Sequence, residues 1–147
     1  MTGKGYVITA SIRHANQIKC DEIWQITRSD KTLSGVIWVP ELAPSWSLFN
    51  EYNNNWKNKP PEEWWPDYMK RFNEEIQSQV KLQALRRLWT HVQQGKVIAL
   101  VCFCTDRAYC HRRLIAEFLE NQGIRTEEFT APSSDPKDSV NQPALFN

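Results

Sequence analysis

An excess of one charge sign is missing from this sequence, as is a long hydrophobic run. Its 147 residues include 18 Lys and Arg and 17 Asp and Glu, which gives a formal net charge of +1. A polybasic nucleic-acid coat carries far more positive charge, so any contact with nucleic acid has to come from a local patch. No apolar run is long enough to cross a bilayer, and the first residues lack the apolar core of a signal peptide. We therefore expect no membrane partner.

Widely spaced cysteines are also absent. Cys20 stands alone, and the other three cysteines lie between positions 102 and 110. A secreted disulfide scaffold instead spreads its cysteines along the chain to join distant loops. We therefore expect reduced thiols and a cytoplasmic protein.

The composition and length suit one folded domain. Charged residues make up 24% and hydrophobic residues 41% of the chain, a balance typical of globular proteins. From Thr130 onward the sequence becomes polar and proline-containing. We predict a single domain over residues 1–129, which is long enough to bury a core, and a disordered tail over residues 130–147.

Patterns of apolar residues predict alternating strands and helices. Pro61, followed by two acidic residues, begins a helical region that ends at Gly95 as two helices or one bent helix. Residues 96–104 form a continuous apolar run, typical of a strand buried in a parallel sheet, and a helix follows over 110–121. The other predicted elements are strands over 6–10, 23–28, 36–39 and 124–129 and a short helix over 46–52. This order predicts the α/β class, as a single three-layer Rossmann-like domain with a mainly parallel sheet.

The loop between the apolar run and the helix is the main candidate site. Ligands of α/β sheets usually bind at this carboxyl edge, and the helix start offers free N–H groups and a positive dipole. At such a position the pKa of a cysteine is expected to be lowered, which makes Cys110 the candidate nucleophile. We predict Cys110, His111 and Asp106 as catalytic residues, with His111 as the acid or base. The predicted ligands of an anion, a phosphate or a carboxylate, include Cys104, Arg107, Arg112 and Arg113.

Two other interpretations use the same loop. A phosphatase loop needs an arginine six positions after its cysteine, but Cys102 is followed there by Ala108 and Cys104 by Cys110, which excludes it. A metal centre would use Cys102, Cys104, Cys110 and His111, since the first two share one face of a strand. The usual zinc spacing leaves two residues between ligands, so we predict no metal and no cofactor. We expect Cys102 to be a core residue.

Five of the seven tryptophans lie between positions 38 and 65. Trp65 follows the helical core pattern, and Trp38 is also predicted to be a core residue. Trp46, Trp56 and Trp64 are candidates for a lid or groove on which bases stack. We count Trp46 among the predicted ligand-binding residues.

Two motifs carry a resemblance to a known family. The first joins Leu100–Cys104 to Cys110–Glu117. The second is Glu41–Leu48, which contains a Leu-Ala-Pro-Ser segment, followed by the helical residues Trp65, Tyr68, Arg71, Phe72, Glu74 and Glu75. On these motifs, which come in the family's order and cover most of residues 6–129, the chain resembles the domain of unknown function 488 family.

The resemblance implies a compact α/β domain with a Rossmann-like sheet. Many members carry an arginine at a strand end near the site, and Arg28 occupies that place here. Arg28 and Ser45, which ends the Leu-Ala-Pro-Ser segment, are therefore further candidate ligand-binding residues. The family's strand end is Asp-Val-Arg-like, whereas this chain has Ile26-Thr27-Arg28. Some relatives lack the cysteines, so the resemblance implies no single reaction.

The tail contains a second short motif, Gln142-Pro143-Ala144-Leu145-Phe146. It resembles the peptide that binds the bacterial sliding clamp, in which a glutamine is followed by two residues and then Leu-Phe. Gln142, Leu145 and Phe146 are the predicted partner-binding residues. The alternative is that Leu145 and Phe146 pack against their own domain.

These features favour an enzyme that acts on a nucleotide or on DNA, in DNA repair or processing. The sequence leaves two alternatives open. One is a non-enzymatic module that binds nucleic acid or protein while tethered to the sliding clamp. The other is a cysteine-based metal or redox sensor.

Overall fold

Five parallel strands form the centre of the molecule in the computed structural model, which describes residues 5–104 and 106–131. The strands lie in the order β3-β2-β4-β1-β5. All four pairs of neighbouring strands are parallel. Their bounds are Tyr6–Ser11 for β1, Glu22–Gln25 for β2, Val36–Trp38 for β3, Val97–Cys102 for β4 and Thr126–Glu128 for β5. The predicted α/β class and parallel sheet are confirmed.

The helices begin and end near the predicted positions. The α-helices are α1 (Trp46–Glu51), α2 (Pro61–Ile76), α3 (Gln79–Gln93) and α4 (His111–Asn121). Short turns of 3-10 helix occupy η1 (Ile12–Gln17), η2 (Pro40–Leu42) and η4 (Arg107–Tyr109), and η3 (Tyr52–Trp56) is a π-helical turn. The region after Pro61 is two helices because Ser78 starts a new one, its side chain accepting a hydrogen bond from the Lys81 N–H.

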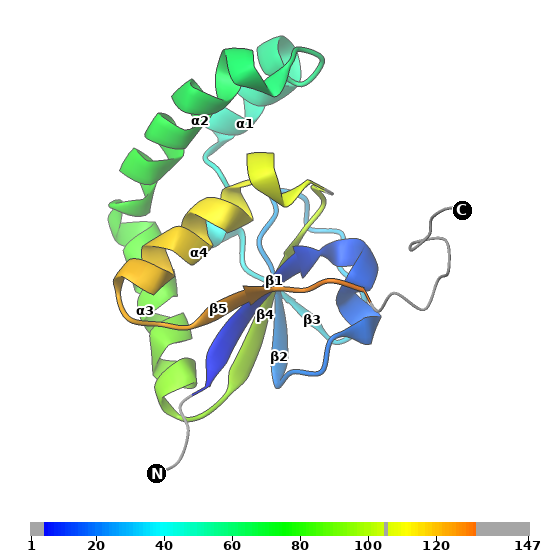
Figure 1. The fold of residues 1–147 in the computed structure, drawn as a ribbon, viewed down its shortest axis with the longest axis vertical. Helices are drawn as coiled ribbons and strands as arrows, with labels where there is room; N and C mark the ends of the chain where they lie inside the picture. Colours follow the sequence, from blue (N-terminus) through cyan, green and yellow to red (C-terminus); the bar gives the residue numbers. More distant parts are fainter. Residues whose placement is uncertain (1–4, 105, 132–147) are drawn as a thin grey trace, which may run out of the picture.

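Helices flank the sheet on both faces, as Figure 1 shows. The connections from β3 to β4 and from β4 to β5 cross the sheet in the same direction, and the connection from β1 to β2 crosses in the opposite one. Right-handed crossovers therefore place α3 and α4 on one face and η1 on the other. The layer formed by η1 is much shorter than the layer formed by α2, α3 and α4 (Figure 1).

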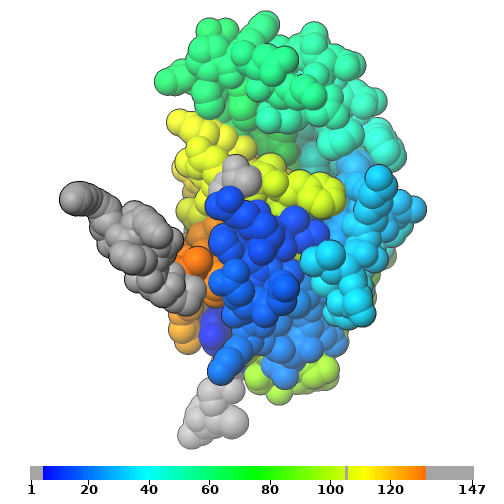
Figure 2. Space-filling view, turned by 90° about the vertical axis from the view of Figure 1, so that its right-hand side faces the viewer, coloured from blue at the N-terminus to red at the C-terminus, as the bar shows by residue number. Residues whose placement is uncertain are grey.

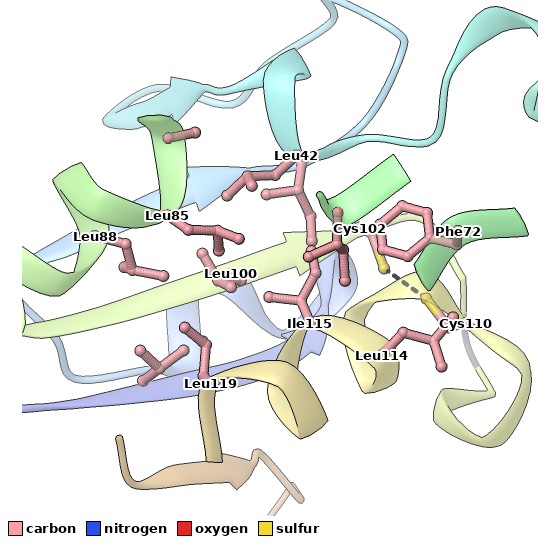
Figure 3. Close-up of a cluster of buried hydrophobic side chains, with 14 of the residues drawn as sticks. Leu42, Phe72, Leu85, Leu88, Leu100, Cys102, Cys110, Leu114, Ile115 and Leu119 are labelled. Atoms are coloured by element: carbon pink, nitrogen blue, oxygen red, sulfur yellow. Dashed lines mark hydrogen bonds between the residues drawn. The ribbon is translucent and has the colours of Figure 1, made fainter. Parts of the chain in front are cut away.

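The main core lies between the sheet and the layer of α2, α3 and α4. Leu100 and Cys102 of β4 are buried there against Leu85 of α3 and Ile115 of α4 (Figure 3). Such aliphatic side chains each stabilise the fold by about 2–5 kcal/mol when compared with alanine. This core fixes the first residues of α4 against the last residues of β4. The candidate site lies where the two segments meet.

The positions of Trp38 and Trp64 differ from those expected from the sequence. Trp38 is 39% exposed because β3 is an edge strand, so its prediction as a core residue is wrong. Trp64, one of the three candidates for a lid or groove, is a buried core residue instead.

No helix within residues 5–104 and 106–131 is long and apolar enough to span a membrane. The predicted clamp-binding residues Gln142, Leu145 and Phe146 lie outside the described residues, as does the predicted tail from residue 132 onward.

Candidate active site

A cavity of about 130 Å³ opens at the carboxyl edge of the sheet, between the ends of β2 and β4. The segments that follow these strands form its floor, and aromatic residues of the helical region form its walls. Figure 2 shows the segment after β4 (yellow-green) at the surface, between the region of α1 and α2 (teal to green) and the N-terminal elements (blue). The lining residues are Thr27, Arg28, Ser29, Pro44, Phe49, Tyr52, Tyr68, Cys102, Phe103, Cys104, Tyr109 and His111.

Three cysteines and a histidine meet beside this cavity. The Sγ atoms of Cys102 and Cys110 are 3.2 Å apart (Figure 3). The sulfur atoms of Cys102, Cys104 and Cys110 and a ring nitrogen of His111 all lie within 4.8 Å of one another. Cys102, Cys104 and His111 line the cavity, whereas Cys110 lies behind them and is 1% exposed. None of the four cysteines of the chain forms a disulfide, and these groups can chelate a soft metal ion or react as thiols.

Arg112 contacts two of these sulfur atoms and does not line the cavity. Its Nη1 atom donates to the Cys104 carbonyl at 2.8 Å and to the Cys102 sulfur at 3.3 Å. Its other edge forms an ion pair with Glu128 at 2.8 Å, and the Arg112 side chain is only 1% exposed. Thr9 donates a further hydrogen bond to the same carboxylate at 2.6 Å. Arg112 therefore bonds to internal partners and does not line the cavity, and its role as a ligand for an external anion stays a prediction.

The three thiols differ in acidity. Hydrogen bonds from Cys104 and Cys110, together with the charge of Arg112, lower the pKa of Cys102 well below its usual value. The hydrogen bond to Cys102 raises the pKa of Cys104 to about 12. Burial raises the pKa of Cys110 well above its usual value, so the predicted lowering at the helix start is wrong. Burial outweighs the helix dipole here, and the geometry favours Cys102 as the thiolate.

The backbone of Ile26, the residue directly after β2, orients the ring of His111. Its Nε2 atom lies 2.8 Å from the Ile26 carbonyl oxygen, which only accepts, so Nε2 carries the proton and donates it. Burial lowers the pKa of His111, which favours the neutral ring. The Nδ1 lone pair is then directed toward the Cys110 sulfur, 3.7 Å away. His111 thus contacts Cys110 and positions it, while its predicted role as acid or base stays a prediction.

Three predicted residues of the loop lie outside the cavity lining. Asp106 accepts a hydrogen bond from the Ala108 N–H at 3.0 Å and caps η4. Arg107 pairs with Glu128 at 3.5 Å, and Arg113 pairs with Glu117 at 3.0 Å. The predicted convergence of the loop's arginines on one anion is therefore not found, because each already has an acidic partner.

Of the predicted ligand-binding residues Arg28, Ser45 and Trp46, only Arg28 lines the cavity. Arg28 lines the cavity, donates to the Pro40 carbonyl and stacks over Trp46, with 5.4 Å between its guanidinium carbon and the ring centre. Its Nε atom is buried and has no hydrogen-bond partner within residues 5–104 and 106–131. Trp46 is 59% exposed and lies outside the cavity lining. Ser45 caps α1 and donates a hydrogen bond from its hydroxyl to Glu75 at 2.5 Å, so it also lies outside the lining.

Sequence reasoning missed the aromatic walls of the cavity. Tyr68 is buried on α2 against Tyr52 of the π-helical turn, with 6.4 Å between the ring centres. Tyr109 packs on the same cluster through Trp65 at 5.8 Å. The available signal was the spacing of Trp65, Tyr68 and Phe72, which places the three side chains on one face of a helix.

One comparison with known proteins found a match. A family model described as the active DUF488-N3 subclade (DUF488-N3a) matches residues 7–123. The matched range contains every residue that lines the cavity. No curated protein and no solved structure was found to match the chain.

Proposed function

The chain belongs to the DUF488 family, as its two motifs predicted, and from this premise we propose that it is an enzyme that uses Cys102 as a nucleophile on a nucleotide or nucleic-acid substrate. The description of the matched subclade as active supports an enzymatic role. The proposal replaces Cys110 by Cys102 as the attacking group.

The position of the Cys102 sulfur is the observation that carries the proposal. It lies at the carboxyl end of β4, faces the cavity and receives a hydrogen bond from the buried guanidinium of Arg112 at 3.3 Å. A thiol next to a fixed cation in a ligand-sized cavity is the usual arrangement of a nucleophilic cysteine. Cys110, at 3.2 Å, can donate its own S–H to the Cys102 sulfur and so stabilise its thiolate form.

The cavity favours a substrate with a flat ring and a negative charge. Its walls contain Phe49, Tyr52, Tyr68 and Tyr109, whose faces can stack on a base, and its volume of about 130 Å³ suits one ring. Arg28 lies in the lining, and its buried Nε has no hydrogen-bond partner among the described residues. A guanidinium is the preferred partner of a phosphate. Together these features support a nucleoside phosphate, free or within a nucleic acid.

A redox role is the second candidate function. The two sulfur atoms of Cys102 and Cys110 are 3.2 Å apart, and both are nearly fully buried. An acidic thiol beside a second thiol suits reversible oxidation, in which a peroxide takes two electrons and two protons and leaves a disulfide. This candidate corresponds to the sensor interpretation of the sequence.

The proposed context is DNA repair or processing at the sliding clamp. Its support is the sequence motif of Gln142, Leu145 and Phe146 alone. A tethered peptide would raise the local concentration of the domain at the clamp without any new contact in the domain itself.

A substrate panel tests the enzymatic proposal. The full chain is incubated under reducing conditions and with a chelator, with mononucleotides and with short single-stranded and double-stranded oligonucleotides. Mass spectrometry then detects a covalent adduct or a released product. The control variant is Cys20→Ser, because Cys20 precedes β2 and so lies at the opposite edge of the sheet.

We expect product or adduct with the wild-type chain and with Cys20→Ser, and neither with Cys102→Ser. Turnover that survives in Cys102→Ser contradicts the nucleophile. A folded wild-type chain that modifies no member of the panel contradicts the substrate class. Turnover that requires a peroxide, with disulfide formation, favours the redox candidate.

A further inference from the structure

We propose that Cys102, Cys104, Cys110 and His111 form a binding site for one divalent metal ion of the zinc class. This inference rests on the positions of four donor atoms and not on the proposed function, although both use the Cys102 sulfur. It also departs from the sequence-based expectation that no metal binds, which rested on ligand spacing alone.

The positions of the four donor atoms carry the inference. Tetrahedral zinc with Zn–S bonds of about 2.3 Å requires sulfur atoms about 3.8 Å apart. The four donor atoms lie within 4.8 Å of one another, and the closest pair of sulfurs, those of Cys102 and Cys110, is 3.2 Å apart. Small side-chain movements thus convert the group into a tetrahedron. Three thiolates and one imidazole are one of the standard ligand sets of a structural zinc site.

The fold explains how an unusual ligand spacing becomes a compact site. Cys102 ends β4, Cys104 follows the bend at Phe103, and both cysteines line the same cavity. Cys110 is the cap of α4 and His111 is its first residue. Packing of α4 against β4 brings these two pairs together, and this tertiary contact replaces the short Cys-x-x-Cys turns of common zinc sites.

His111 is arranged as metal-binding histidines usually are. Its Nε2–H donates to the Ile26 carbonyl at 2.8 Å, which fixes the ring and leaves Nδ1 directed at the Cys110 sulfur, 3.7 Å away. A ligating histidine almost always gives its second N–H to such an acceptor. This contact fixes the tautomer as well as the orientation.

Arg112 supplies the outer contacts that a thiolate-rich site needs. Its Nη1 atom lies 3.3 Å from the Cys102 sulfur and 3.6 Å from the Cys110 sulfur, so it can donate to both as thiolates. The cavity provides the entry path, because Cys102, Cys104 and His111 all line it. A metal ion at this site would be coordinated by the Cys102 sulfur. The same sulfur could then not act as a nucleophile, so metal binding and nucleophilic attack by Cys102 exclude each other.

Cobalt binding tests the site. Chelator-treated, reduced full chain is titrated with Co²⁺, whose visible and near-ultraviolet bands report tetrahedral geometry and sulfur ligation. We expect a tetrahedral, thiolate-rich spectrum that saturates at one Co²⁺ per chain and that Zn²⁺ abolishes. Cys20→Ser should give the same spectrum as the wild type.

Cys104→Ser is the decisive variant, because Cys104 is exposed and its replacement leaves the core intact. We expect weaker Co²⁺ binding and a loss of sulfur charge-transfer intensity, in a variant whose circular dichroism is unchanged. A wild-type chain without a tetrahedral spectrum overturns the proposal, as does a Cys104→Ser spectrum identical to the wild type. These results are independent of turnover, so a failed metal site and a failed Cys102 nucleophile are told apart.

Discussion

The guanidinium of Arg112 joins the sulfur of Cys102, 3.3 Å from Nη1, to the carboxylate of Glu128, 2.8 Å from Nη2. Burial opposes the charged form of Arg112, but the hydrogen bond to Glu128 raises its pKa and keeps the cation in place. Glu128 belongs to β5, at the edge of the sheet, whereas Cys102 ends the central strand β4. The edge strand therefore contributes to the electrostatics of a thiol two strands away.

The acidity of Cys102 leads to a prediction about its reactivity. The lowered pKa of Cys102 favours its thiolate form, whereas an ordinary thiol with a pKa of about 8.5 is mostly protonated at neutral pH. We expect iodoacetamide to label Cys102 first at neutral pH in chelator-treated protein. Its rate should fall only when the pH drops through its lowered pKa. Peptide mapping by mass spectrometry gives the order, and labelling of Cys110 before Cys102 contradicts it.

Loss of the Glu128 carboxylate should destabilise the fold. The substitution Glu128→Gln leaves the Arg112 charge buried with a neutral partner, and breaking a buried ion pair costs about 3–5 kcal/mol. Because the Glu128 side chain is 23% exposed, solvent screening reduces this cost, and we expect a loss below that range, about 2 kcal/mol.

Urea denaturation of Glu128→Gln beside Glu127→Gln checks this expectation. Glu127 pairs with Arg125 at the surface, where both side chains are largely exposed, so its loss should change stability by less than about 0.5 kcal/mol. Equal effects of the two substitutions would rule out the buried ion pair as a stabilising contact.

The substitution Gly5→Ala should damage the entry to β1. A Cβ atom at this position would lie 1.7 Å from the Lys96 carbonyl oxygen, a backbone atom that cannot move aside cheaply. Overpacking of this kind costs about 1–3 kcal/mol or more.

Gly35→Ala is the matched control for Gly5→Ala, because among the described residues, chain neighbours aside, no atom lies within 4 Å of its added Cβ. Gly35 has a φ of +80°, so we expect only the backbone penalty of about 1–2 kcal/mol. Thermal unfolding of both variants compares a steric clash with pure conformational strain. A smaller loss for Gly5→Ala than for Gly35→Ala contradicts the close approach.

The elements could be predicted from the sequence far better than the site. Local signals marked the buried strand after Gly95 and the helix after Cys110, because apolar periodicity acts over short distances. The pairing of Arg112 with Glu128 and the aromatic wall around Tyr68 depend on tertiary contacts, which no local pattern encodes. The sequence favours Cys110 over Cys102 because a helix start lowers the pKa of a thiol. Burial depends on tertiary packing, and here it raises the pKa of Cys110 instead.

The tail motif yields a prediction of its own. If residues 142–147 bind the sliding clamp, the double substitution Leu145→Ala and Phe146→Ala should abolish binding of the full chain to purified bacterial clamp, measured by calorimetry. Apolar anchors supply most of the affinity of such peptides, so the loss should be complete within the measurable range. Equal binding by the variant, or none by the wild type, contradicts the motif.

Arg28 should govern the affinity for phosphates in the cavity. A hydrogen bond to a charged group contributes about 1.5–3 kcal/mol, so Arg28→Gln should weaken binding of a mononucleotide by about tenfold or more. Arg71→Gln is the control, because Arg71 pairs with Glu51 and lies outside the cavity lining. Binding is measured by calorimetry in the Cys102→Ser background, which blocks the proposed reaction and isolates recognition. If the parent nucleoside loses as much affinity as the nucleotide, Arg28 acts through the shape of the cavity and not through the phosphate.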